Sequence, residues 1–341
     1  MLQEIAEQPA ALEKTIAEEC EKVRRLAQAV RGRDIDLIVL VARGSSDNAA
    51  LFGRYLLEIT TGIPVSLSAP SVHTLYHAKL NLKHALVIGV SQSGEGEDIN
   101  LVLDNARACG AFTIGITNEP ASSMVQLVDE TLLMHGGKER SVAATKTFTG
   151  QMLLFYMLAS ALANRGAAID YQSIPNLAAQ ALEQKPAMVE LVQRYVFMEN
   201  CVVVGRGLAY ANAYEFALKL METCYVVAER FSSADFLHGP VAMIERHFPV
   251  ILFAPPGAML PGTKDLIDRL RELNADTLVI TGDLDAAAKC TRSIIMSREI
   301  DEFLAPIPYI IPAQMFAALL AEAKGLDPDK PRSLSKVTRT L

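Results

Sequence analysis

Short apolar runs rich in β-branched residues alternate with helical segments along most of this chain. In the first half, the pattern predicts strands at 35–41, 64–67, 85–90, 112–116 and 130–134. Uniformly apolar strands that alternate with helices are typical of a parallel sheet covered by helices on both faces. The alternation therefore predicts an α/β fold built on a doubly wound parallel sheet.

The same pattern returns in the second half. The run 201–207 and the helical segment after it resemble the run 39–44 and its helix, and further strands are predicted at 250–254, 277–280 and 293–296. A chain of 341 residues is also too long for one small core. We therefore expect two similar α/β domains in tandem.

The segments outside the two repeats set the expected boundaries. Apolar residues recur at helical spacing near the N-terminus, and the stretch between the repeats is polar and helical. Near the C-terminus, Pro328, Pro331 and the apolar Leu334 favour a tail that docks rather than frays. The predicted divisions are an N-terminal helical segment (1–32), a first domain (33–165), a helical connection (166–196), a second domain (197–325) and a C-terminal tail (326–341).

Charge and composition exclude several classes of protein. The net charge is −7 and no basic run is present, which argues against a nucleic-acid-binding surface. The apolar run 152–162 is too short to cross a bilayer, and the N-terminus lacks the pattern of a signal peptide. The five cysteines are scattered and lack metal-ligand spacing. We expect a cytoplasmic protein with reduced cysteines, no metal site and no membrane contact.

Two serine-rich turns follow predicted strands of the first half. These turns, Gly44-Ser45-Ser46 and Ser91-Gln92-Ser93, each precede a helical segment. A strand, a tight turn and a helix in succession aim backbone N–H groups and hydroxyls at one point, where the helix dipole also favours an anion. Helix capping alone is the alternative. Because both turns lie where doubly wound sheets bind ligands, we expect a phosphorylated ligand; neither turn has a nucleotide-binding glycine pattern.

Charged residues of the second half leave two interpretations open. Glu215, Lys219 and Glu222 lie at helical spacing on one face, as either an exposed ion-pair ladder or a functional cluster. His238 precedes a Gly-Pro break, and a structural loop histidine is the more common reading of such a residue. Lys336 would ordinarily be a solvated residue of a C-terminal tail.

Taken in order, these motifs resemble the sugar isomerase (SIS) domain family. The resemblance covers about residues 35–341. Within the family the chain is similar to the isomerase half of glutamine–fructose-6-phosphate amidotransferase, and more closely to stand-alone glucosamine-6-phosphate deaminases. The motifs that carry the likeness to the amidotransferase half are Gly44-Ser45-Ser46, Ser91-Gln92-Ser93-Gly94-Glu95, Val142-Ala143-Ala144-Thr145-Lys146, Ala217-Leu218-Lys219-Leu220-Met221-Glu222, Leu237-His238-Gly239-Pro240 and Lys336. Those that carry the closer likeness to the deaminases are Arg43-Gly44-Ser45-Ser46-Asp47, Ala69-Pro70-Ser71-Val72, Phe231-Ser232-Ser233-Ala234-Asp235-Phe236-Leu237-His238 and Pro328-Asp329-Lys330-Pro331.

The resemblance implies a set of residues that bind the sugar phosphate. Those expected at the 6-phosphate are Ser46, Ser91, Gln92 and Ser93, with Ser45 a weaker contact, and those expected near the rest of the sugar are Val142, Ala144 and Ser335. Two positions depart from the amidotransferase pattern. Gly96 stands in place of a threonine and Ala144 in place of a serine, which implies one phosphate donor fewer and a different contact to the sugar.

The resemblance also implies catalytic roles. Glu222 would move a proton between C2 and C1 of the sugar, and Lys219 would position Glu222 or a sugar hydroxyl. His238, supplied by the neighbouring subunit of a homodimer, would open the sugar ring. Lys336 would assist ring opening or form a Schiff base with the keto sugar. No metal or redox cofactor is implied.

The implied reaction is glucosamine 6-phosphate plus water to fructose 6-phosphate plus ammonia. Two alternatives remain: a deglycase or isomerase of another 6-phosphosugar amine, such as fructosamine or galactosamine 6-phosphate, and a non-catalytic sugar-phosphate sensor. Glutamine-dependent synthesis is not expected, because the chain reaches its first predicted strand near residue 35 without a glutamine-hydrolysing domain before it.

Overall fold

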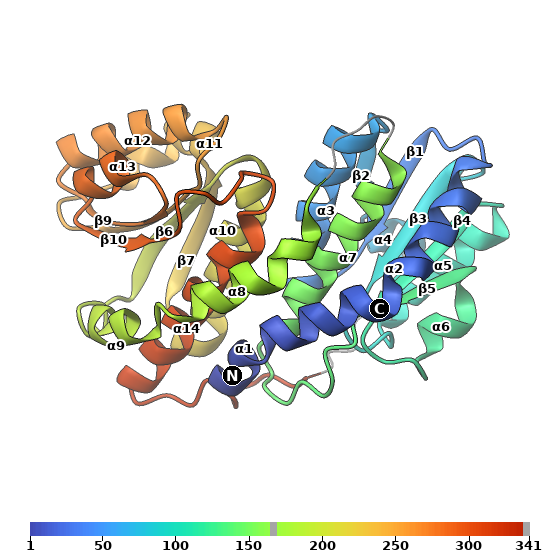
Figure 1. The fold of residues 1–341 in the computed structure, drawn as a ribbon, viewed down its shortest axis with the longest axis horizontal. Helices are drawn as coiled ribbons and strands as arrows, with labels where there is room; N and C mark the ends of the chain where they lie inside the picture. Colours follow the sequence, from blue (N-terminus) through green and yellow to red (C-terminus); the bar gives the residue numbers. More distant parts are fainter. Residues whose placement is uncertain (164–168, 337–341) are drawn as a thin grey trace. The chain divides into compact units, whose positions relative to one another are not determined.

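The computed structural model describes residues 1–163 and 169–336, and the chain forms two compact units. Unit 1 comprises Met1–Ala6 and Asn176–Arg332, and unit 2 comprises Glu7–Pro175 and Ser333–Leu341. Each unit is built around one five-stranded parallel sheet (Figure 1). Two doubly wound α/β domains in tandem were predicted, and the structure confirms this fold class.

The sheet of unit 2 has the strand order β2-β1-β3-β4-β5. Every neighbouring pair is parallel, and β1 lies between β2 and β3. The order of the strands therefore reverses between β1 and β3, which is the place where such sheets bind ligands. The strands are β1 (Leu37–Val41), β2 (Val65–Leu67), β3 (Ala85–Val90), β4 (Phe112–Thr117) and β5 (Glu130–Leu133).

Helices cover this sheet. Helix α7 packs against α2 and α3, and it is buried along almost its whole length, including the polar Lys146, Thr147, Thr149 and Gln151 of its first turns. Helix α5 packs against β3 and β4. The helices of unit 2 are α2 (Gln8–Arg31), α3 (Ser45–Thr61), α4 (Pro70–Thr74), α5 (Glu97–Ala108), α6 (Ser123–Leu127), α7 (Lys146–Leu162) and the 3-10 turn η1 (Tyr171–Ser173).

Unit 1 repeats the strand topology of unit 2. Its order, β10-β9-β8-β6-β7, matches that of the first sheet when β6 is set against β1 and β7 against β2. Four of the strands were predicted, and β7 was missed. The strands are β6 (Asn200–Gly205), β7 (Val227–Ser232), β8 (Pro249–Ala254), β9 (Asp276–Thr281) and β10 (Arg292–Ile295).

Helix α14 lies at the centre of the packing of unit 1 and contacts α1, α9 and α10. The other helices of this unit lie around the sheet, and α8 contains the boundary between the units. The helices are α1 (Leu2–Ala6), α8 (Ile174–Leu182), α9 (Lys185–Gln193), η2 (Gly207–Ala209), α10 (Tyr210–Lys219), η3 (Leu220–Cys224), α11 (Ser233–Leu237), η4 (Pro240–Met243), α12 (Leu260–Glu272), α13 (Leu284–Lys289) and α14 (Pro306–Ala323).

The N-terminal segment expected to be helical over 1–32 consists of two helices, α1 and α2, which belong to different units. Pro9 lies in the first turn of α2, where its missing N–H costs no hydrogen bond. Within the described residues, α14 is the one helix long and apolar enough to cross a membrane, and 89% of that window is buried. A core helix of a folded domain has this character.

Aromatic packing on α14 predicts where unit 1 is most sensitive to mutation. The ring of Phe316 is fully buried, 5.5 Å from the ring of Tyr195 and 5.7 Å from that of Phe216. We expect Phe316→Ala to lower the free energy of unfolding by about 3–5 kcal/mol through the cavity it leaves. The control Val189→Ala, at a largely exposed position, should change it by less than about 0.5 kcal/mol. Calorimetric unfolding of the two variants beside the parent chain measures both.

Candidate functional site

The two serine turns lie side by side at one edge of the sheet of unit 2. Strands β1 and β3 are parallel neighbours, with Val41 paired to Gly89 at their carboxyl ends. Gly44-Ser45-Ser46 follows β1 and leads into α3, and Ser91-Gln92-Ser93 follows β3 and leads towards α5. The structure therefore brings together two of the sequence-predicted elements at the switch point of the sheet.

The second serine turn offers several donors to an anion. The hydroxyl oxygens of Ser91 and Ser93 accept the backbone N–H groups of Gly94 and Glu95, so each hydroxyl hydrogen stays available for a ligand. In the described part of the chain, the backbone N–H groups of Gln92 and Ser93 have no acceptor. Backbone N–H groups and hydroxyls that converge in this way form an anion site.

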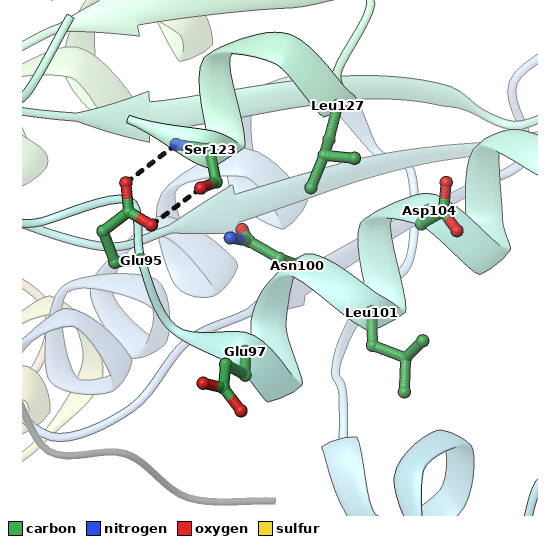
Figure 2. Close-up of a pocket in the computed structure, with 7 residues that line it drawn as sticks. All are labelled: Glu95, Glu97, Asn100, Leu101, Asp104, Ser123 and Leu127. Atoms are coloured by element: carbon green, nitrogen blue, oxygen red, sulfur yellow. Dashed lines mark hydrogen bonds between the residues drawn. The ribbon is translucent and has the colours of Figure 1, made fainter. Parts of the chain in front are cut away.

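Three contacts fix the shape of the second serine turn. The Glu95 carboxylate accepts the backbone N–H and the hydroxyl of Ser123 at 2.8 and 2.7 Å (Figure 2). These two bonds lower the pKa of Glu95. The Asn100 amide donates to the carbonyl of Gly94 at 3.1 Å, and the buried Asp98 carboxylate accepts from Arg43 Nε of the first turn at 2.7 Å.

Gly94 is required at its position in this turn. Its φ of +66° lies in the left-handed region, and a Cβ there would stand 2.2 Å from the Ser122 hydroxyl oxygen. Beside the turn, a groove lined by Glu95, Glu97, Asn100, Leu101, Asp104, Ser123 and Leu127 carries three acidic side chains (Figure 2). Because these carboxylates repel an anion, the groove does not suit a phosphate, whereas the donors on the serine side of the turn do.

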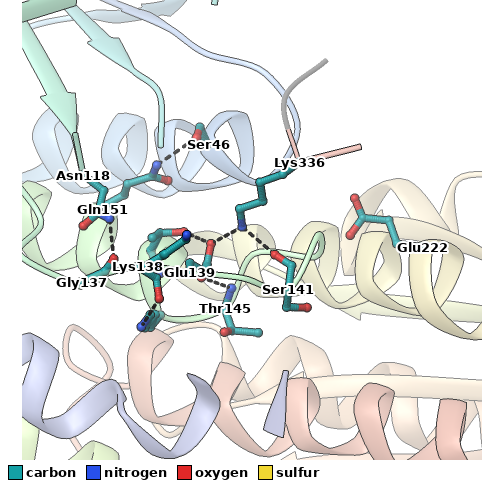
Figure 3. Close-up of polar contacts among 12 residues, drawn as sticks. Ser46, Asn118, Gly137, Lys138, Glu139, Ser141, Thr145, Gln151, Glu222 and Lys336 are labelled. Carbon is teal, nitrogen blue, oxygen red and sulfur yellow. Dashed lines mark hydrogen bonds and ion pairs between the residues drawn. The ribbon is translucent and has the colours of Figure 1, made fainter. Parts of the chain in front are cut away.

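The first serine turn is tied to helix α7. The Ser46 hydroxyl accepts from the Gln151 amide at 2.9 Å, and both side chains are buried (Figure 3). Gly44 has a φ of +57° and a Cβ at this position would meet no atom, so conformation and not space requires glycine there. Ser45 is the first residue of α3 and is half-buried.

Val142 and Ala144 are half-buried in the loop that joins β5 to α7. The Lys336 ammonium is held at this loop by the Glu139 carboxylate at 2.6 Å and the Ser141 carbonyl at 2.7 Å (Figure 3). Ser335, the residue before it, is exposed. Of the described tail, 333–336 belongs to unit 2, whereas 326–332, with Pro328 and Pro331, belongs to unit 1, and Leu334 is 45% exposed. The contact with this loop is therefore made by Lys336 and not by the apolar and proline residues from which docking was predicted.

In unit 1, the buried charges of α10 and η3 form a cluster rather than an exposed ladder. Lys219 and Glu215 are fully buried, and their charged atoms lie 3.4 Å apart. Lys219 Nζ also lies 2.5 Å from Glu222 Oε2, whose side chain is 23% exposed. A buried charge without partners is unstable, so the two carboxylates hold the ammonium and Lys219 in turn fixes Glu222.

Glu222 does not lie in a regular α-helix. Helix α10 ends at Lys219, and Leu220–Cys224 forms a π-helical turn that ends at Tyr225, whose φ is +55°. Wide turns of this kind occur frequently at functional sites. The Tyr225 hydroxyl accepts the backbone N–H of Arg332, and its ring lies under the Arg332 guanidinium.

His238 does not lie beside Glu222 in this chain. Glu222 precedes β7 and His238 follows it, at the end of α11. A six-residue strand spans about 20 Å, so the two residues lie at opposite ends of β7. His238 is exposed, and within the described residues no hydrogen bond or ion pair holds its ring.

Sequence reasoning missed two residues that shape the site, and the contact made by a third. Gln151 contacts Ser46 and Glu139 contacts Lys336, and in both pairs the two residues are far apart in the sequence. No local sequence pattern therefore identifies Gln151 or Glu139. Glu95 was part of a quoted motif, yet its partner Ser123 could not be inferred from spacing. Across residues 1–163 and 169–336, no three His, Cys, Asp or Glu side chains are grouped so that they could hold a metal ion.

Comparison with known proteins places this geometry in a family. A model described as the SIS domain matches residues 33–161 and 198–322. The glutamine–fructose-6-phosphate aminotransferase (isomerizing) of Gloeobacter violaceus is 36% identical over 352 aligned residues, which cover 98% of this chain and 58% of that protein. The chain thus spans less than two thirds of that relative's length.

Solved structures agree with the family model. A crystal structure from Silicibacter pomeroyi, described as a candidate phosphosugar isomerase, is 33% identical with a TM-score of 0.85, covering 96% of this chain and 98% of that one. The glucosamine-6-phosphate deaminase of Thermotoga maritima is 22% identical with a TM-score of 0.77 and 99% coverage of both chains, which is a likeness of fold. Since the SIS model matches most of the chain, once in each unit, this protein belongs to the SIS domain family.

Proposed function

We propose that this chain deaminates glucosamine 6-phosphate to fructose 6-phosphate and ammonia. The observation that carries the proposal is the pair of serine turns at adjacent strand ends, with hydroxyl and backbone donors available for an anion. Family membership and the aminotransferase relative support a sugar phosphate as the substrate class. In this proposal Ser46, Ser91, Gln92 and Ser93 hold the 6-phosphate, with Ser45 as a weaker contact.

The remaining sugar contacts belong to the loop before α7 and to the docked tail. Val142 and Ala144 are half-buried there, and Ser335 lies beside Lys336. We assign these residues to the sugar chain beyond the phosphate. Because Ala144 carries no hydroxyl, it contributes packing and not a hydrogen bond at this position.

Glu222 is the proposed acid and base. Its carboxylate removes the C2 proton of the open-chain amino sugar, which gives an enolamine, and then returns the proton to C1, which gives the C2 imine. Water adds to C2 and ammonia leaves, so fructose 6-phosphate remains. The contact with buried Lys219 supports this role, because it fixes one carboxylate oxygen while the side chain stays partly open to a ligand.

His238 is proposed to open the ring in the active site of a second copy of the chain. It would protonate the ring oxygen and accept the proton of the anomeric hydroxyl. Its separation from Glu222 by the length of β7 supports a homodimer with shared sites, since one copy does not bring the two residues together. Lys336 would assist ring opening or form a Schiff base with the keto sugar.

A second candidate function is isomerisation or deglycation of another 6-phosphosugar or its amine. The likeness to the Silicibacter pomeroyi protein favours it, because that structure covers nearly the whole chain at a higher identity than the deaminase structure. A non-catalytic sensor would need the serine turns alone. The buried contacts of Glu222 with Lys219 and of Lys336 with Glu139 favour an enzyme instead.

Substrate profiling tests the proposed reaction. We expect ammonia release from glucosamine 6-phosphate, and release slower by about tenfold or more from galactosamine and fructosamine 6-phosphates, as expected for hydroxyl groups misplaced in a fitted site. Ammonia is measured with a coupled assay for each of the three sugars. Faster release from either of the other two would support the second candidate, and no release from any of them would refute deamination.

Replacement of the proposed acid and base should separate catalysis from binding. We expect Glu222→Gln to lower kcat by about 10²–10⁴-fold, because the amide cannot accept the C2 proton. Calorimetric titration with fructose 6-phosphate should give a dissociation constant within about threefold of the parent value, since the phosphate contacts remain. The control Glu190→Gln, at an exposed position on α9, should leave both unchanged. Normal turnover by Glu222→Gln would contradict the assigned role.

Subunit mixing tests whether the His238 of one subunit acts in the active site of the other. If sites are shared, a heterodimer of Glu222→Gln and His238→Ala contains one intact site and one inactive site. In a fully exchanged equal mixture about half of the dimers are heterodimers, so the mixture should recover about a quarter of the parent activity. Each variant alone should be inactive, and the mixture is assayed after reversible denaturation and refolding together. Recovery no greater than the sum of the two variants would place His238 in its own chain's site or outside catalysis.

A further inference from the structure

Glu139 is a buried carboxylate in the loop between β5 and α7, where the proposed function assigns it no role. Its side chain is 0% exposed, yet it accepts four hydrogen bonds. An ionised carboxylate in such a position is stable only when its oxygens are fully engaged. The groups that donate these four hydrogen bonds are therefore the groups that Glu139 holds in place.

The two carboxylate oxygens have different partners. Oε1 accepts the backbone N–H groups of Thr145 and Thr147 at 2.9 and 3.2 Å. Oε2 accepts the Thr147 hydroxyl at 2.8 Å. It also accepts the Lys336 ammonium at 2.6 Å (Figure 3). Capping the first turn of α7 needs only the first oxygen. The second oxygen is left to hold the amine of the tail.

The loop itself supplies the other contact to the amine. Lys336 also donates to the Ser141 carbonyl at 2.7 Å, and its side chain is one-quarter exposed (25%). An ammonium group has three N–H donors. In the described residues two of them are engaged, so the amine is held from one side and remains open on another.

The same helix connects this amine to the first serine turn. Glu139 fixes the N-terminal turn of α7, and Gln151, one turn further along α7, donates to the Ser46 hydroxyl. The contacts of Lys336 with Glu139 and of Ser46 with Gln151 are therefore both fixed by the same helix (Figure 3). A reactive amine needs this kind of support, because small displacements of a catalytic group lower rates strongly.

We propose that Glu139 is a positioning residue that holds the Lys336 amine at the sugar-binding loop. This inference rests on the proposed function, in which Lys336 reacts with a keto sugar. Before it attacks, the ammonium gives one proton to a base, and the Glu139 carboxylate is in contact to accept it. The neutral amine then adds to the C2 carbonyl, water leaves, and a C=N bond forms.

The test compares Glu139→Gln with the control Thr147→Val. The amide keeps an oxygen for the backbone N–H groups of α7 but loses the charge that holds Lys336. Thr147→Val removes the hydroxyl contact to the same carboxylate and leaves that charge in place. Thermal unfolding of both variants shows that they fold.

Two readouts separate positioning from reaction. The first readout is the acylation rate of Lys336 in the absence of substrate, measured by a brief pulse of an amine-acylating reagent. Peptide mass spectrometry quantifies the labelling relative to the exposed Lys185. A lower rate means that the Lys336 amine is held more firmly. Borohydride reduction in the presence of fructose 6-phosphate traps the Schiff base as a stable mass increase on the Lys336 peptide. We expect Glu139→Gln to raise the labelling rate about tenfold and lower the trapping rate about tenfold or more, with Thr147→Val near the parent in both.

The outcomes distinguish the positioning role of Glu139 from the Schiff base proposed at Lys336. Unchanged labelling of Lys336 in Glu139→Gln would overturn the positioning role. Equal losses of trapping in both variants would overturn it as well, because they would trace the effect to the N-terminus of α7. Raised labelling together with no trapped adduct in the parent protein would leave Glu139 as the residue that holds the amine, and would refute the Schiff base in the proposed function.

Discussion

Both sheets are parallel, and in unit 2 this one constraint brings the two serine turns together. All strands of a parallel sheet end at the same edge, so the turns after neighbouring strands meet there. In unit 2 the turns after β1 and β3 carry the serines, and an ion pair joins Arg43, the residue before the first turn, to Asp98 of α5, the helix that follows the second. The site then depends on helices that begin at this edge and on the loop before α7.

Much of the fold followed from the sequence because the strands are uniformly apolar. Strand β7 was missed, since Glu229 and Arg230 interrupt its apolar pattern and the strand lies at the edge of its sheet. The serine turns were recognised from their place after strands. Gln151 and Glu139 were not, because their contacts with Ser46 and Lys336 each span more than a hundred residues of sequence, and only the folded chain brings these residues together.

Buried charge organises both units in the same way. In unit 1 the ammonium of Lys219 lies between two carboxylates, and in unit 2 the carboxylate of Glu139 lies between backbone donors and an ammonium. In each case a fully buried charge holds a partner that is only partly buried, Glu222 or Lys336. Such pairs cost desolvation free energy, and they fix the position of a group that the proposed function places at the ligand.

The wide turn at Leu220–Cys224 bears on how this family can diversify. A π-helical turn holds one residue more than an α-helical turn, so the loss of a single codon there would let the backbone relax to an ordinary α-helix with its ladder intact. The residue facing Lys219 would then change identity. A chain that takes this step would keep the serine turns and the core while it loses the carboxylate that contacts Lys219.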